Sequence, residues 1–125
     1  FLLVDNEMID KKLMSKLIEI GQKEDFDALN RLFLPGEVEE KGSTMRQGFK
    51  AWYDLADTLA EEEIAALIKT FTIAEKVLKG WKAGSISPVI WLGIKLKERK
   101  FNGLDEIRRW VKEHGDHNSW LTQRW

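Results

Sequence analysis

Cysteine is absent from the 125-residue sequence. Without thiols the chain can form no disulfide, no thiolate metal site and no cysteine nucleophile. Long apolar runs are absent too, since no stretch approaches the roughly 20 residues that a membrane-spanning helix needs. The sequence also lacks a Gly-x-Ser-x-Gly elbow and a glycine-rich phosphate loop. We therefore expect no membrane association, a cytoplasmic location, and none of these familiar catalytic or nucleotide-binding sites.

The overall composition is that of an ordinary folded protein, with 43% hydrophobic and 33% charged residues. A chain of this length is expected to form one domain over residues 1–125, with a core of its own. The net charge of −1 conceals an asymmetry between the two halves. Residues 1–63 hold 8 Lys and Arg against 15 Asp and Glu, whereas residues 64–125 hold 12 against 6. Such halves either favour an acidic partner for the basic end or simply attract each other.

Apolar residues recur at three-and-four spacing along most of the chain, and no period-two pattern predicts a strand. The predicted helices form three successive pairs, in residues 5–34, 44–79 and 88–114. Short links within each pair favour antiparallel hairpins. We therefore expect an all-α fold, a compact orthogonal bundle of about six helices in three hairpin-like pairs. A short solenoid of helical pairs is the alternative, because the spacing of about 40 residues is typical of such repeats.

The stretch 85–101 is the one on which the rest of the chain is expected to pack. Ser87 is a good N-cap, because its hydroxyl can accept a hydrogen bond from an amide of the first turn. Pro88 then occupies the first helical position, where its missing N–H has no intrahelical partner to lose. The next two turns are apolar nearly all round, which is typical of a buried helix. The residues expected to be almost fully buried are Ile90, Trp91 (at least in large part), Leu92 and Ile94.

Two capping boxes are predicted in the middle of the chain, at Thr44–Gln47 and Thr58–Glu61. The second box predicts a break between two helices, with the hydroxyl of Thr58 and the carboxylate of Glu61 both bonded to the backbone. The acidic run at residues 61–63 then lies in a first turn, where the helix dipole favours negative charge. Nearer the N-terminus, Gly21 is expected to weaken the last turn of the first helix.

The two histidines, His114 and His117, are three residues apart, with Glu113 and Asp116 beside them. A metal site requires histidine and carboxylate atoms that converge on one point. Gly115 lies between the histidines and indicates that the helix ends there, so we predict neither a metal site nor a cofactor. The serines have capping or turn explanations, which leaves an enzyme of unknown reaction as the third functional hypothesis.

The basic second half raises the alternative of nucleic-acid binding. A helix, a glycine-containing turn and a second helix follow in the order of a helix-turn-helix. However, the would-be recognition helix begins Pro-Val-Ile-Trp-Leu, whereas such a helix contacts bases with polar N-terminal residues. A nucleic-acid-associated domain is therefore the runner-up. The basic residues concerned are Lys76, Lys79, Lys82, Lys95, Lys97, Arg99, Lys100, Arg108, Arg109 and Lys112.

Tryptophan is unusually frequent, with six residues in the chain. Trp52, Trp91 and Trp110 have the helical spacing of core residues. The other three lie in a glycine-flanked turn, residues 80–84, and in the C-terminal tail. Exposed tryptophan is enriched at binding hot spots, because it supplies a large rigid contact area. The structural alternative is that these three clamp a turn and the tail onto the body.

From these patterns we predict a non-catalytic protein-binding or regulatory domain whose partner is another protein. The turn at residues 80–84 is expected to lie on the surface, where Trp81 would anchor an acidic or apolar partner. The competing interpretation makes Trp81 a lid over the preceding helix. The predicted binding residues are Lys79, Trp81, Lys82, Trp120 and Trp125.

Overall fold

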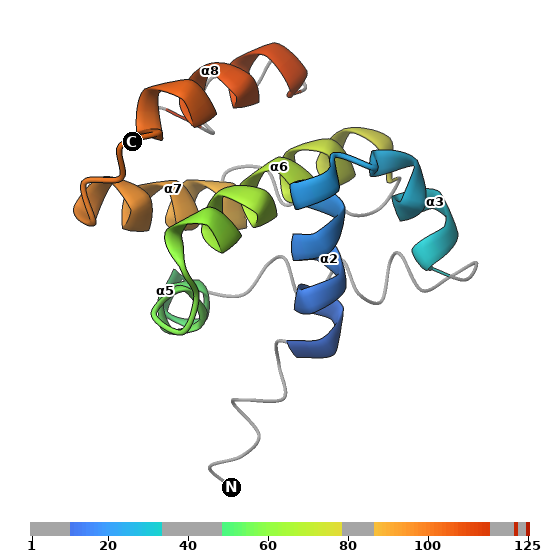
Figure 1. Cartoon of the computed structure of the whole chain (residues 1–125), viewed down its shortest axis with the longest axis horizontal. Coiled ribbons are helices and arrows are strands. Elements are labelled where there is room, and N and C mark those ends of the chain that lie inside the picture. The colour runs from blue at the N-terminus through green and yellow to red at the C-terminus, as the bar shows by residue number, and fades with distance from the viewer. Residues whose placement is uncertain (1–10, 34–48, 79–86, 116–121, 123–124) are drawn as a thin grey trace, which may run out of the picture.

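The computed structural model describes residues 11–33, 49–78, 87–115, 122 and 125 (Figure 1). No strand occurs among these residues, and the expected all-α bundle is confirmed. The Thr44–Gln47 capping box and the turn at residues 80–84 lie outside the described residues. The helices, in chain order, are α2 (Lys11–Lys23), the 3-10 helix η1 (Phe26–Ala28), α3 (Leu29–Leu32), α5 (Phe49–Ala56), α6 (Glu61–Val77), α7 (Pro88–Glu98) and α8 (Leu104–His114).

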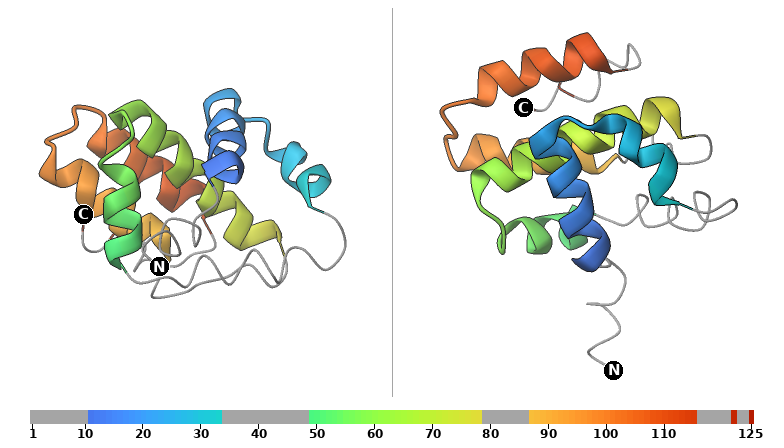
Figure 2. Two further views of the ribbon diagram at one scale, coloured as in Figure 1. Left: turned by 90° about the horizontal axis from the view of Figure 1, so that it is seen from below. Right: turned by 45° about the vertical axis from the view of Figure 1, so that its right-hand side comes forward.

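Helix α6 holds the centre of the bundle, and its most extensive contact is with α2, which lies far earlier in the sequence. It packs against α2, α7 and α8, while α5 packs on α7 (Figures 1 and 2). The closest packing therefore runs across the three predicted pairs rather than within them. The stretch 85–101 was expected to be central, but α6 has this place because apolar or small side chains on several of its faces are buried.

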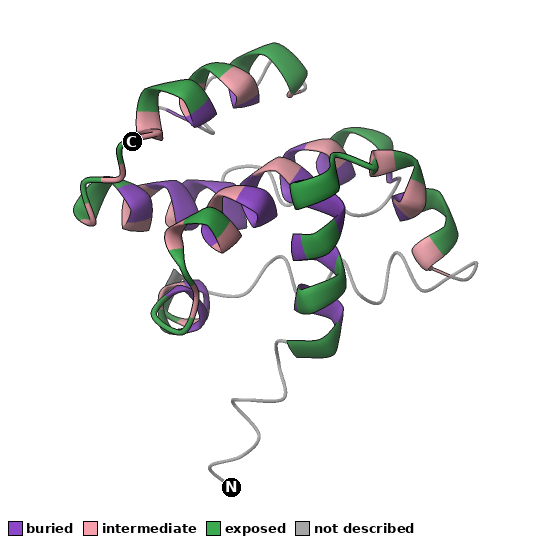
Figure 3. Ribbon diagram, in the orientation of Figure 1, coloured by how far each residue is buried: buried purple, intermediate pink, exposed green. Residues whose placement is uncertain are grey.

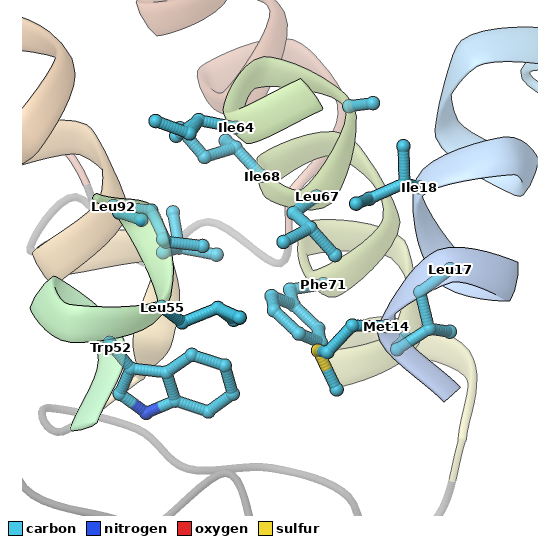
Figure 4. Close-up of a cluster of buried hydrophobic side chains, with 14 of the residues drawn as sticks. Met14, Leu17, Ile18, Trp52, Leu55, Ile64, Leu67, Ile68, Phe71 and Leu92 are labelled. Atoms are coloured by element: carbon cyan, nitrogen blue, oxygen red, sulfur yellow. The ribbon is translucent and has the colours of Figure 1, made fainter. Parts of the chain in front are cut away.

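The core is one cluster that α6 shares with the helices on either side (Figure 4). Phe71 of α6 and Trp52 of α5 form a T-shaped contact, with ring centroids 5.5 Å apart. Met14 and Leu17 approach the same region from α2, and both are buried. Figure 3 shows the pattern on the ribbon, since the buried side of α2 faces α6 and its other side is exposed.

Helix α7 begins as predicted. The Val89 amide donates to the Ser87 hydroxyl at 3.2 Å, and Pro88 is the first helical residue. Ile90 and Leu92 are buried as expected. The expectation for Ile94 was wrong, because this residue is only partly buried.

Ile94 is only partly buried because neighbouring helices do not cover α7 on every side. Trp91 and Ile94 are three residues apart and so share one side of the helix. Helices α5, α6 and α8 contact α7 on its other sides. That shared side is thus left partly open to solvent, and Trp91 is half-buried with Ile94.

The break between α5 and α6 is confirmed, but its predicted cap was wrong. Helix α6 begins at Glu61, so Ala60 rather than Thr58 precedes it. The Glu63 carboxylate accepts a hydrogen bond from the Ala60 amide at 2.8 Å. The Thr58 hydroxyl instead donates to the Leu55 carbonyl at 2.7 Å, at the end of the preceding helix. The start of α6 is therefore capped by the carboxylate of Glu63, two residues after the predicted Glu61.

Replacing Glu63 with alanine should lower the free energy of unfolding by about 1 kcal/mol, a typical value for a lost helix cap. Thr58→Ala should have the smaller effect, because Thr58 is exposed and its hydroxyl bonds only one carbonyl. Urea denaturation of both variants, followed by circular dichroism, measures the difference. A larger loss of stability for Thr58→Ala than for Glu63→Ala would instead support the capping box predicted at Thr58–Glu61.

Gly21 does not weaken α2 but lets it approach α6 closely. The helix continues to Lys23, and a Cβ atom at position 21 would collide with the Ala66 carbonyl and the Thr70 hydroxyl. The chain then leaves α2 through Glu24, which has a left-handed φ of 52°, with the Asp25 amide bonded to the Ile20 carbonyl at 3.1 Å. This hydrogen bond is typical of a Schellman helix end.

Gly21→Ala should destabilise the fold, although alanine favours a helix by roughly 0.5–1 kcal/mol over glycine. The added methyl group meets backbone of α6, which cannot move aside as a flexible side chain would. Overpacking of this kind typically costs about 1–3 kcal/mol, so the clash should outweigh the gain in propensity. A thermal melt tests the sign of the effect, with Ser15→Ala on the exposed side of α2 as the control. A stabilised Gly21→Ala protein would mean that α2 and α6 are not in close contact there.

Candidate binding site

Four of the five predicted binding residues lie outside the described part of the chain: Lys79, Trp81, Lys82 and Trp120. The fifth, Trp125, is only 2% exposed. Its indole lies against Gly93 of α7, where a Cβ atom would collide with the ring. The clamping interpretation of the tail therefore describes Trp125, since its indole packs on α7 instead of facing a partner.

A surface hollow lies between α6, α8 and the link that joins α7 to α8, and it was not predicted from the sequence. Its volume is about 180 Å³. Its wall is mostly apolar or aromatic, with one cationic and one anionic side chain at its rim. The lining residues are Ala65, Lys69, Phe101, Gly103, Glu106, Ile107 and Trp110.

Trp110, which lines this hollow, contacts two other rings of the chain. Its spacing predicted a core residue, yet it is only partly buried. The His114 ring stacks on it at a centroid distance of 4.1 Å, and Phe26 of η1 lies 5.7 Å from it in a tilted arrangement. The His114 Nδ1 atom is also 2.9 Å from the Trp110 carbonyl oxygen. These contacts fix the indole before any ligand arrives.

Charged groups surround the apolar wall. The Lys69 ammonium lies 5.4 Å from the centre of the Trp110 ring and 3.2 Å from the Glu24 carboxylate. A cation at this distance from an indole face is attracted by the ring. Glu62 and Glu106 are exposed and form no ion pair with any described residue. The hollow thus combines an apolar wall, one cation that is already engaged and one exposed carboxylate, Glu106.

Two basic residues of the proposed nucleic-acid surface are engaged with α5. Lys95 pairs with Asp57 at 2.8 Å and lies over the Tyr53 ring, 4.4 Å from its centre. Its hydrogen bond lowers the pKa of the Asp57 carboxyl. Arg99 donates to the Ala56 and Leu59 carbonyls at 2.8 and 2.9 Å. Because these carbonyls lie at and just beyond the end of α5, Arg99 supplies partners that the helix itself cannot.

The start of α7 is also unsuited to base contacts. Pro88, Val89 and Ile90 are buried against the body. A recognition helix contacts bases through its N-terminal residues, which must reach the groove. The burial of this segment agrees with the sequence argument against a helix-turn-helix.

A buried polar pair links α6 to the cap of α7. The Ser87 hydroxyl donates to the Glu75 carboxylate, and both residues are buried. A serine next to an acid can suggest a nucleophile, but a nucleophile must reach its substrate. Ser87 has no exposed surface, so the pair has the arrangement of a structural contact that holds the N-cap in place.

Among the residues that the structure describes, no three His, Asp or Glu side chains are grouped to hold a metal ion. His117 lies outside this set, and His114 stacks on Trp110. None of the described helices combines the length and the apolar character that crossing a membrane requires. Comparison with known protein families, with curated proteins and with solved structures finds no match to the chain.

Proposed function

We propose that this chain is a non-catalytic binding domain that recognises another protein through the hollow between α6 and α8. One large apolar side chain of the partner fills the hollow. The observation that carries the proposal is the size and lining of the hollow, with Ala65 and Ile107 at its wall and Trp110 already fixed beside them.

The volume of the hollow favours a side chain over a metabolite. Pockets for small ligands and cofactors usually measure about 300–1,000 Å³. A cavity of about 150 Å³ is known to hold a benzene-sized group. At about 180 Å³ the hollow is therefore too small for a typical cofactor and matches one leucine, methionine or phenylalanine side chain.

The rigidity of the aromatic wall supports the same function. Trp110 is held by Phe26 and His114, so binding need not order its side chain. Immobilising a flexible side chain at an interface costs about 0.5–1.5 kcal/mol, and a fixed indole avoids this loss. Tryptophan is also enriched among the few residues that dominate binding energies.

Selection from a library of random peptides displayed on phage tests the proposal without a known partner. Ala65→Leu fills the hollow, and Ala51→Leu makes the same substitution at a partly buried position of α5. Peptides selected on the wild-type chain should bind Ala51→Leu equally well. They should bind Ala65→Leu at least tenfold more weakly, because burying one apolar side chain is worth about 1.5–3 kcal/mol.

Equal affinity for wild type and Ala65→Leu would contradict the proposal, and so would a selection that yields no binder. Thermal melts of both variants show whether they remain folded. If Ala65→Leu is unfolded at the assay temperature, Ala65→Val takes its place as the smaller filling substitution.

A further inference from the structure

Helices α6 and α8 run in the same direction on either side of the hollow. Ala65 and Lys69 of α6 line it together with Gly103, the residue before α8, and Trp110 of α8. The more C-terminal lining residues of the two helices, Lys69 and Trp110, lie close together, with the ammonium near the ring. Figure 1 shows the same orientation, with the first turns of both helices on the left.

Five carboxylates gather in the first turns of these two helices. Three of them are the consecutive Glu61, Glu62 and Glu63 of α6, and two are Asp105 and Glu106 of α8. Each helix N-terminus contributes only about half a positive charge, so the carboxylates outweigh both dipoles. The first turns of both helices are therefore acidic, and one of these carboxylates, Glu106, lines the hollow.

The partners of these carboxylates show which of them are free to meet a ligand. Glu63 accepts the Ala60 amide, and Asp105 pairs with Arg108 at 2.7 Å. Glu106 lines the hollow itself. Glu62 precedes Ala65 by three residues and so lies on the same side of α6 as the hollow.

We infer that the partner segment carries a lysine or arginine beside the apolar residue that enters the hollow. This inference rests on the proposed function and adds the chemical class of the partner. The apolar side chain packs on Ala65, Ile107 and Trp110, while the neighbouring cation lies between Glu62 and Glu106. The partner is thus a basic segment of a protein, whereas an acidic or apolar partner was expected for the turn at residues 80–84.

Lys69 excludes the reverse arrangement, in which the cation enters the hollow and stacks on the indole. Its ammonium already lies near the Trp110 ring and pairs with Glu24. A second cation at the same ring would meet like-charge repulsion from Lys69. The apolar group therefore takes the hollow, and the cation lies at the acidic first turns.

The experiment uses the phage-selected peptides with a pair of charge variants. Glu62→Gln/Glu106→Gln removes the carboxylate that lines the hollow and the one on the same side of α6. Glu19→Gln/Asp54→Asn removes two exposed carboxylates on α2 and α5. The selected peptides should be enriched in Lys or Arg within a few positions of a large apolar residue. Their affinity for Glu62→Gln/Glu106→Gln should fall about threefold to tenfold, as expected for the loss of two exposed ion pairs.

The control pair should leave the affinity unchanged to within about twofold, since its charges lie on other helices. At roughly 1 M salt the difference between wild type and Glu62→Gln/Glu106→Gln should disappear, because the screening length shrinks to about 3 Å. Peptides without basic enrichment that bind Glu62→Gln/Glu106→Gln as tightly as wild type would overturn this inference and leave the hollow as the site. Binding that survives Ala65→Leu would overturn the proposed function itself.

Discussion

Replacing Trp52 with alanine should lower the free energy of unfolding by about 3–5 kcal/mol, the largest effect expected of any single substitution here. Trp52 is fully buried, and its indole meets the Phe71 ring edge-on in the middle of the core (Figure 4). Alanine would remove that packing and leave a cavity between α5 and α6. Urea unfolding followed by far-ultraviolet circular dichroism measures the loss without relying on tryptophan fluorescence.

Two further variants separate packing from other contributions. The Trp52 indole N–H has no hydrogen-bond partner among the described residues, so its contribution comes from packing. Trp52→Phe should therefore retain most of the stability. Tyr53→Ala, at the partly exposed neighbouring position, should cost much less than Trp52→Ala. If Trp52→Ala loses under 1 kcal/mol, the core does not pass through α5 as described.

Local chemistry made the start of α7 predictable. A serine at the N-cap followed by proline at the first helical position favours a helix start through local contacts alone. Ser87 and Pro88 have these predicted roles. The cap of α6 was missed because a threonine and a glutamate three residues apart fit the same pattern at Thr58 as a true box would. Ala60 has no side-chain acceptor, so only the Glu63 half of a box is formed.

Contacts between distant residues were not predictable. Apolar periodicity shows that one side of a helix is buried but not which helix covers it. Gly21 illustrates the limit. Glycine is needed at this position because the backbone of α6, some 45 residues away in the chain, lies close to it, and not because of its own helix. Arg99 is another case, since its charge suggested a nucleic-acid ligand and its bonds go to carbonyls at the end of α5.

The candidate site was missed for the same reason. Trp110 has the spacing of a core residue, and nothing local shows that its outer edge borders a hollow. The hollow is lined by the small Ala65 of α6 together with Phe101 and Ile107, which are distant from it in the sequence. Lys69 directly follows the apolar run of residues 64–68 in α6, and its charge was the one local signal of a partly open surface. Trp125 was predicted as a binding residue, with docking of the tail as the structural alternative. It docks on α7, where Gly93 leaves room for its indole.

Leu92→Ala should cost about 2–5 kcal/mol, from lost transfer energy and the remaining cavity. Leu92 is fully buried on α7, which packs against α5, α6 and α8. Ile94→Ala is the matched control on the same helix, because Ile94 is partly exposed and its removal leaves a site that water can fill. The control should therefore lose clearly less than Leu92→Ala. Equal losses at the two positions would mean that α7 has no outward side.

A third substitution, Leu67→Ala, distinguishes α6 from α7 as the centre of the fold. Leu67 is also fully buried, and α6 contacts helices from both ends of the chain. Leu67→Ala should lower the free energy of unfolding by as much as Leu92→Ala or more, within the same range of about 2–5 kcal/mol. The residues around Leu67 are expected to be less able to move into the cavity. Thermal and urea unfolding of the three variants under one set of conditions gives the ranking. A Leu67 variant that is more stable than the Leu92 variant would return the central position to α7.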